Sequence, residues 1–150
     1  MEIERKFLIN EKEINFKEYP HHSLEQGYLS TNPVVRVRKE DDEYYLTYKG
    51  KGDALAHEEY NLPLTKESYD HLIQKADGNI ITKNRYLIPF GDHLTIELDE
   101  FLAPAKVAGV LMAEVEFPTI EEANSFTPPE WFKEEVTYDP FYRNANISKL

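Results

Sequence analysis

The sequence predicts an α+β fold, in which an eight-stranded antiparallel β-barrel, or tunnel, carries a few short helices packed outside it. Three observations predict this fold. Apolar residues alternate with charged residues at a period of two in most segments, which is typical of strands. Only two or three short stretches show helical spacing or helix caps. Charged residues repeat at i and i+2, so they share strand faces. Alternation alone also fits an open sheet, and closure of the barrel is therefore an additional inference.

Turns and caps delimit the elements. The predicted strands cover residues 2–9, 25–30, 34–39, 43–49, 57–62, 80–89, 93–101, 110–117 and 134–138. Residues 11–24 are expected to be irregular with a short helix, and the glycines of segment 49–52 indicate a loop. Thr65 caps a helix over 66–76, whose apolar residues repeat at i, i+3, i+4 and i+7. Thr119 begins a second short helix that ends before the two prolines at 128–129.

Composition limits the class of protein. The 150 residues, 41% of them hydrophobic, predict one domain over 1–150 with a substantial core. The chain has no cysteine, which excludes disulfides and thiolate metal sites. We expect a cytoplasmic location, because no signal peptide and no apolar run of roughly 18 residues is visible. The net charge of −11 argues against nucleic acid and against an anionic membrane surface as partner.

Acidic pairs with i, i+2 spacing lie inside three predicted strands. The pairs are Glu2 with Glu4, Glu97 with Asp99, and Glu114 with Glu116. Two carboxylates on one strand face are roughly 7 Å apart at Cα, so both can reach one ion or flank two. Oxygen ligands suit Mg²⁺ or Mn²⁺. Glu59 joins this set on a face shared with His57 and Asn61. The alternative interpretation is a solvated strand face that carries charge for solubility.

Basic residues show the same patterning although they are scarce overall. They are Lys6, Arg36, Arg38, Lys49, Lys83 and Arg85. Arginine forks match phosphate oxygens bidentately, and lysine supplies a compact charge. The alternative is structural pairing with acids across strands. Burying this many ion pairs is neutral or unfavourable for stability, so a functional lumen that holds metal ions and a polyanion explains the pattern better.

Other familiar sites are absent from the sequence. There is no phosphate-binding G-x-x-x-x-G-K-[ST] loop, no G-x-G-x-x-G and no H-E-x-x-H. The five histidines show no spacing typical of metal ligands, and no Ser–His–Asp set can be argued.

The ordered motifs along the chain resemble the CYTH domain, the triphosphate tunnel metalloenzymes, and in particular their short single-domain bacterial members. The N-terminal E-x-E-x-K signature alone is a weak signal, whereas the ordered set is a strong one. The matching segments are 2–8, 26–29, 35–38, 46–50, 82–86, 96–101, 113–117, 135–139 and 142–144. The resemblance implies an eight-stranded antiparallel tunnel that hydrolyses triphosphates with Mg²⁺ or Mn²⁺.

The resemblance also implies roles for individual residues. The expected metal ligands are Glu2, Glu4, Glu59, Glu114 and Glu116. The expected phosphate-binding cations are Lys6, Arg36, Arg38, Lys49, Lys83 and Arg85. The expected catalytic residues are Lys49, Glu97 and Asp99, with the two acids placing a second metal or the attacking water. One departure stands out: the family often carries R-x-E-x-E where this chain has His57, Glu59 and Asn61, so one cation and one acid are replaced.

The function expected from this resemblance is metal-dependent hydrolysis of the terminal phosphoanhydride of inorganic triphosphate, with nucleoside triphosphates as further substrates. A charged lumen recognises phosphate, and no base-recognition element is apparent. Two alternatives remain open within the same tunnel, a class IV-type adenylate cyclase and a thiamine triphosphatase. A third alternative is a module that binds polyphosphate without catalysis.

Overall fold

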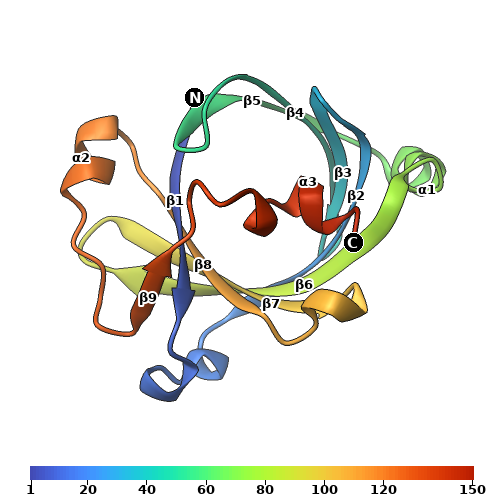
Figure 1. Ribbon diagram of the computed structural model, residues 1–150. Coiled ribbons are helices and arrows are strands. Elements are labelled where there is room, and N and C mark those ends of the chain that lie inside the picture. Colours follow the sequence, from blue (N-terminus) through green and yellow to red (C-terminus); the bar gives the residue numbers. More distant parts are fainter.

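A computed structural model describes residues 1–150 as one closed antiparallel sheet with short helices around it (Figure 1). The strands are β1 Glu2–Ile9, β2 His21–Thr31, β3 Val34–Glu40, β4 Glu43–Gly52, β5 Ala56–Pro63, β6 Asp77–Phe90, β7 Leu94–Ala103, β8 Leu111–Glu116 and β9 Phe132–Glu135. The α-helices are α1 Lys66–Ile73, α2 Ile120–Ser125 and α3 Asn144–Ile147. The 3₁₀ turns are η1 Glu11–Glu13, η2 Phe16–Glu18, η3 Ala105–Val107 and η4 Pro140–Tyr142.

The strand order closes the barrel that the sequence predicts. The order is β5-β4-β3-β2-β6-β7-β8-β1-β9, and an additional pairing joins β5 to β1. Two residue pairs make this closing contact, Glu2 with His57 and Ile3 with Ala56. Strand β9 lies outside the closed ring and pairs with the C-terminal half of β1. The eight-stranded barrel is therefore confirmed, with one extra short strand beside it.

Several predicted element boundaries are wrong. The helix expected over 66–76 ends at Ile73, and the strand expected over 80–89 begins at Asp77. Segment 49–52 is not a loop but the end of β4, because Gly52 at φ +140° lets the strand shift register and still pair with His57. Residues 21–24 are strand rather than irregular, since they pair with the distant β6. The last strand, expected at 134–138, covers Phe132–Glu135, although the Val136 amide still donates to the Lys6 carbonyl.

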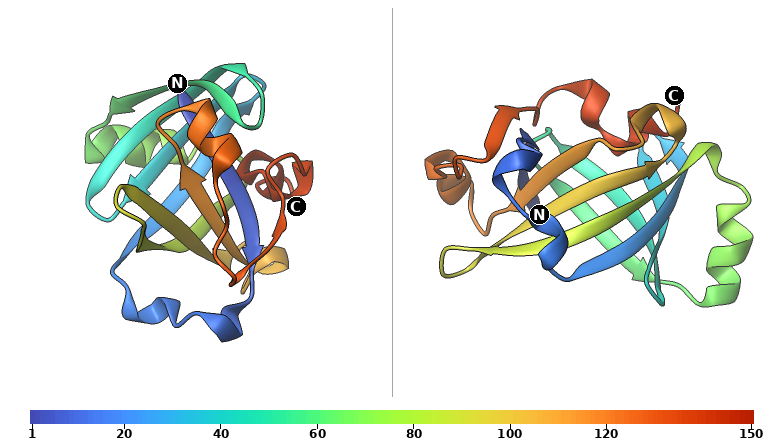
Figure 2. Two further views of the ribbon diagram at one scale, coloured as in Figure 1. Left: turned by 90° about the vertical axis from the view of Figure 1, so that its left-hand side faces the viewer. Right: turned by 90° about the horizontal axis from the view of Figure 1, so that it is seen from below.

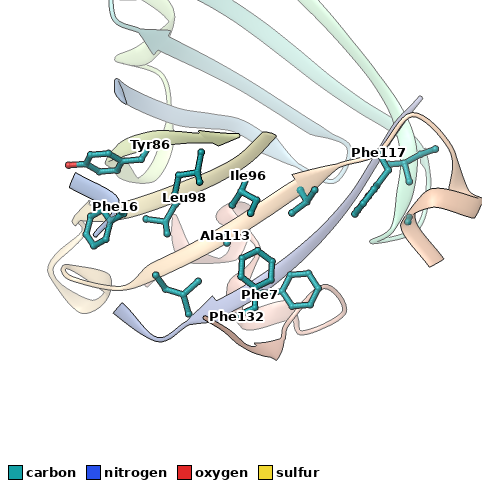
Figure 3. Close-up of a cluster of buried hydrophobic side chains, with 13 residues drawn as sticks. Phe7, Phe16, Tyr86, Ile96, Leu98, Ala113, Phe117 and Phe132 are labelled. Atoms are coloured by element: carbon teal, nitrogen blue, oxygen red, sulfur yellow. The ribbon is translucent and has the colours of Figure 1, made fainter. Parts of the chain in front are cut away.

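The apolar face of the sheet points outward on one side of the barrel and is covered by peripheral segments. Along β1, Glu2, Glu4 and Lys6 line the interior, whereas Ile3 and Phe7 belong to an outer apolar cluster. Figure 3 shows this cluster, in which side chains from the barrel strands meet those of the N-terminal connection and β9. The rings of Phe7 and the β9 residue Phe132 lie 4.7 Å apart between centroids.

The C-terminal segment crosses one end of the barrel (Figures 1 and 2). Its residues Val136 and Ile147 are buried in a second apolar cluster with Tyr28, Phe101 and Met112. Helix α1, by contrast, packs against the outside of β2, β3 and β4. The longest helix, α1, has eight residues, and no helix combines the length and apolar character that a membrane crossing needs.

Leu98 and Leu102 on β7 offer a matched test of the outer core. Leu98 is fully buried and Leu102 is 49% exposed. We expect Leu98→Ala to lower the free energy of unfolding by about 2–5 kcal/mol, because it removes packed apolar atoms and leaves a cavity. Leu102→Ala is expected to change it by less than about 0.5 kcal/mol. Urea denaturation measures both, and equal losses would contradict the assignment of Leu98 to the core.

Candidate active site

The interior of the barrel holds a cavity of about 520 Å³ whose wall is mostly polar. Only five of its 27 lining residues are hydrophobic. The wall includes all six predicted cations, Lys6, Arg36, Arg38, Lys49, Lys83 and Arg85. It also includes five of the predicted acids, Glu2, Glu4, Glu59, Glu97 and Glu114. Strand alternation turns these residues inward, so segments far apart in the sequence meet around one cavity.

Two arginines from β3 carry positive charge that the protein does not neutralise closely. Arg36 is buried, and its Nε atom has no hydrogen-bond partner. Its Nη2 atom lies 3.4 Å from the Thr47 hydroxyl and 3.9 Å from a carboxylate oxygen of Glu59. Arg38 donates from Nε to the Gln26 side-chain oxygen at 2.8 Å. Desolvation, followed by repulsion from Arg36 and Arg85, lowers the pKa of Arg38 to about 9.

Around β1, the charge that lacks a close counter-charge is negative. Burial and the negative charge of Glu114 raise the pKa of Glu4 to about 7. Burial and a hydrogen bond with Glu2 likewise raise the pKa of Glu59 to about 7. Lys6 lies 3.7 Å from Glu4, which is too far for a strong hydrogen bond. Burial also opposes ionisation of Glu2 and Glu114, but the hydrogen bond from His57 and the charges of Lys6 and Arg85, respectively, hold their pKa values below the usual range. Glu4 and Glu59 are therefore the acids that lack compensating positive charge, as expected of groups that receive a cation.

Asp99 does not line the cavity. It is fully buried and binds two cations from β6. Arg85 donates from Nε and Nη2 to the two carboxylate oxygens at 2.8 and 3.0 Å, and Lys83 Nζ lies 2.7 Å from Oδ2. Burial opposes ionisation of Asp99, but the charges of Arg85 and Lys83 outweigh it and hold the pKa of this carboxyl below its usual range. Asp99 therefore fixes the positions of both cations from behind.

Glu116 lies apart from the other acids. It is exposed and lines a smaller hollow with Thr95, Phe117 and Glu97. Glu97 lines both this hollow and the main cavity. Burial, then repulsion from Glu2, raises the pKa of Glu116. Glu116 still faces Glu4 directly across the β1–β8 pairing, so it belongs to the rim of the same acidic region.

Two residues of the site were not predicted from the sequence, His57 as a candidate metal ligand and Asn144 as a hydrogen-bond partner of a cavity cation. The ligand atoms of His57, Glu2 and Glu4 all lie within 4.8 Å of one another. No sequence motif joins these residues, because β1 and β5 meet only through barrel closure. Asn144, near the end of the chain, accepts hydrogen bonds at 3.1 Å from both Lys83 and Gln26. The segment 142–144 had matched the family pattern, but nothing in the sequence indicated this contact.

Asp99→Asn tests the buried ion pairs. Removing this negative charge leaves Lys83 buried without its close counter-charge and leaves Arg85 with only the longer contacts to Glu97 at 3.4 Å and Glu114 at 3.8 Å. We therefore expect a loss of about 3–5 kcal/mol in the free energy of unfolding. Glu100→Gln, on the neighbouring outward position of β7, is expected to cost less than about 1 kcal/mol. Urea denaturation at neutral pH measures both. A loss below about 1 kcal/mol for Asp99→Asn would contradict the anchoring role.

The raised pKa of Glu4 predicts a pH dependence of stability. Because this carboxyl has a higher pKa in the folded than in the unfolded chain, the folded protein binds more protons between about pH 4.5 and 7. When a chelator keeps the site free of metal, the free energy of unfolding should therefore fall by about 1–3 kcal/mol as pH rises through this window. Glu4→Gln should flatten the fall, whereas Glu67→Gln on exposed α1 should not. Thermal unfolding at a series of pH values from 5 to 8 measures this dependence of stability on pH. The same dependence in Glu4→Gln as in the unsubstituted protein would contradict the prediction.

Comparison with known proteins agrees with this tunnel. A model of the CYTH domain family matches residues 1–137. An inorganic triphosphatase from Nitrosomonas europaea is 35% identical over 98% of this chain and 96% of its own length. An inorganic triphosphatase from Acetivibrio thermocellus is 36% identical over 99% of this chain and 93% of its own length. The crystal structure of an inorganic triphosphatase matches with a TM-score of 0.70 and 32% identity over 99% of this chain and 94% of that one. The chain therefore belongs to the CYTH domain family.

Proposed function

We propose that this chain is a metal-dependent triphosphatase that hydrolyses the terminal phosphoanhydride bond of inorganic triphosphate. One observation carries the proposal: arginines without close counter-charges and mutually repelling carboxylates share a single tunnel. A polyanion accompanied by a divalent cation relieves both imbalances at once. The names of the two relatives, both inorganic triphosphatases aligned over nearly their full length, support the same activity.

The cationic part of the wall binds the phosphates. Arg36 and Arg38 offer guanidinium groups whose donors the protein leaves partly unused. Lys83 and Arg85 are held by Asp99, so they face the cavity without losing conformational entropy when substrate binds. Lys6 and Lys49 complete the set beside the acids. Preorganised cations of this kind stabilise the negative charge that develops during phosphoryl transfer.

The acidic part of the wall fits a divalent cation. We propose Glu2, Glu4, Glu59, Glu114 and Glu116 as the residues that hold it, with Mg²⁺ or Mn²⁺ as the cation, because carboxylate oxygens suit both. The raised pKa values of Glu4 and Glu59 are the observation that supports the fit, since such carboxylates gain most from a nearby positive charge. When bound, the cation neutralises phosphate oxygens and makes a water molecule more acidic.

The remaining predicted roles fall to three residues. Glu97 reaches both hollows, and we assign it the orientation of the attacking water. Lys49, at 3.7 Å from Glu2, lies between the acids and Arg36's strand and neutralises the reacting phosphate. Asp99, predicted as catalytic, acts in this proposal as a positioning residue, because both of its oxygens are occupied by Lys83 and Arg85.

The substrate choice follows from the cavity wall. With 22 of 27 lining residues not hydrophobic, the wall recognises charge along its length and offers little apolar surface to a base. Inorganic triphosphate is therefore the preferred substrate, and nucleoside triphosphates are slower ones. Phosphate release from inorganic triphosphate, ATP and thiamine triphosphate in Mg²⁺ or Mn²⁺ tests this order. Cyclic AMP and pyrophosphate as the products from ATP would favour the cyclase instead, and binding without any product would favour a non-catalytic module.

Arg38→Gln tests the phosphate-binding wall. We expect kcat/KM for inorganic triphosphate to fall about 100-fold or more, because one preorganised cation is lost from the transition state. The matched control is Lys39→Gln, the next residue along β3, which points away from the cavity and should leave kcat/KM within about twofold. A steady-state phosphate-release assay measures both variants. Similar activity in Arg38→Gln and Lys39→Gln would contradict the proposed role of the wall.

A further inference from the structure

We propose that His57 is a nitrogen ligand of the divalent cation in the tunnel, and that it makes this chain select Mn²⁺, Co²⁺ or Zn²⁺ over Mg²⁺. The inference rests on the proposed function for the presence of a cation. It goes beyond that function because it adds a ligand outside the carboxylate set and assigns a metal preference to this chain.

The geometry brings the imidazole into the acidic group. His57 Nε2 lies 2.8 Å from an oxygen of Glu2, and the ligand atoms of His57, Glu2 and Glu4 are mutually within 4.8 Å. Two ligand atoms at about 2.0–2.2 Å from one ion can be no more than about 4.4 Å apart, so side-chain shifts of a few tenths of an ångström would let one ion reach all three atoms. Both Glu2 and His57 line the cavity, so the group opens onto the space where phosphate would bind.

The other ring nitrogen is engaged in the way that metal-binding histidines use it. His57 Nδ1 lies 3.3 Å from the backbone carbonyl oxygen of Asp53. Nε2 lies at hydrogen-bond distance from the Glu2 carboxylate and donates a proton to it, so a cation would bind there by displacing that proton. A proton on Nδ1 that points at the Asp53 carbonyl then keeps the Nε2 lone pair directed at Glu2 and Glu4. Metal-bound histidines almost always donate their second N–H to a carbonyl or carboxylate, because this fixes the tautomer and the ring orientation.

A tight turn holds that carbonyl in place. The Asp53 carboxylate accepts hydrogen bonds at 2.9 Å from the amides of Leu55 and Ala56, and its own amide donates to the Ala56 carbonyl. Gly52 precedes the turn at φ +140°, and a Cβ there would meet the Ala56 oxygen at 2.2 Å. The turn thus requires glycine at this position. Together these contacts hold His57 where β5 meets β1.

An imidazole ligand changes which metals bind best. Mg²⁺ is a hard ion that prefers oxygen ligands, whereas imidazole nitrogen suits borderline transition metals, whose affinities rise from Mn²⁺ through Co²⁺. A site made only of carboxylates discriminates weakly in this respect. Adding one nitrogen to Glu2 and Glu4 therefore shifts the preference toward transition metals.

The competing interpretation is that His57 acts as a cation and binds phosphate in place of an arginine. The position of its ring argues against this role. Nε2 points at Glu2, whereas the phosphate-binding guanidinium groups of Arg36 and Arg38 stand on β3, which β4 separates from β5. A protonated ring here would be neutralised by Glu2 and would add little net charge for phosphate.

Isothermal titration calorimetry of the 150-residue protein with Co²⁺ and with Mg²⁺, without triphosphate, tests the inference. We expect Co²⁺ to bind at least tenfold more tightly than Mg²⁺, and we expect His57→Phe to reduce this ratio by about tenfold or more. A general change in charge or stability would alter the affinities for Co²⁺ and Mg²⁺ alike, so it would leave their ratio unchanged. The matched control is His93→Asn: His93 is exposed and also contacts two carboxylates, those of Asp92 and Glu122, so its loss should leave the ratio unchanged.

A second measurement needs no variant. In protein labelled with ¹⁵N at histidine, Zn²⁺ should shift the Nε2 resonance of His57 strongly. No shift at His57, or a wild-type ratio in folded His57→Phe, would overturn the inference. An unchanged Co²⁺ preference in His57→Arg with intact triphosphate affinity would also overturn it, in favour of the cationic role.

Phosphate release on the same preparations separates the two proposals. Hydrolysis of triphosphate with Mg²⁺ together with a Co²⁺ preference that is independent of His57 would overturn the inference and leave the proposed function standing. A Co²⁺ preference that depends on His57 in a protein that releases no phosphate from triphosphate would support the metal site and overturn the proposed function.

Discussion

The structure depends on one constraint: the polar face of the sheet is turned inward, so the closed barrel cannot be filled by its own apolar side chains along its whole length. Strand alternation then sends the apolar face outward, where water would meet it. The chain covers this face with segments that are otherwise unremarkable, including the connection after β1, helix α2 and strand β9. Inside, a second apolar cluster is confined to the end that the C-terminal segment crosses. The cavity stays open because the apolar side chains pack outside the barrel and at this one end, and not along the rest of the interior.

Charges inside such a barrel are arranged by sign as well as by position. Where opposite charges meet at hydrogen-bond distance, as Asp99 does with Lys83 and Arg85, desolvation is offset and the group acts as a structural anchor. In other pairs the opposite charges stand farther apart, at 3.7 Å in Lys6 with Glu4 and at 3.9 Å in Arg36 with Glu59. These loose contacts leave donors and acceptors unused. Stability alone would favour close ion pairs or apolar residues at these positions. The long distances between opposite charges therefore indicate a site that receives charged ligands.

The sequence predicts the fold and the lining of the tunnel well, because both follow from a period of two. Every residue predicted to bind phosphate lines the cavity. Residues such as Asp99 show the limit of this reasoning, since alternation gives the face of a side chain but not its depth or its partners. His57 shows a second limit. Its neighbours Glu2 and Glu4 are more than fifty positions away in the sequence, and only the register of two closing residue pairs brings them together. The end of β4 was missed because Gly52 supports a bulge as readily as a loop.

His57 and Asn61 stand where the resemblance predicts an arginine and an acid. His57 is buried beside Glu2, and the hydrogen bond with Glu2 raises the pKa of its imidazole, whereas Asn61 is exposed and does not line the cavity. Their local effects differ. Asn61 accepts a hydrogen bond from Thr47 at 2.6 Å, and Thr47 in turn contacts Arg36, so Arg36 meets a neutral chain of groups instead of another acid. His57 meets Glu2 with a nitrogen instead of a permanent cation. The pair of changes therefore leaves Arg36 freer to bind an anion and leaves the acids freer to bind a metal.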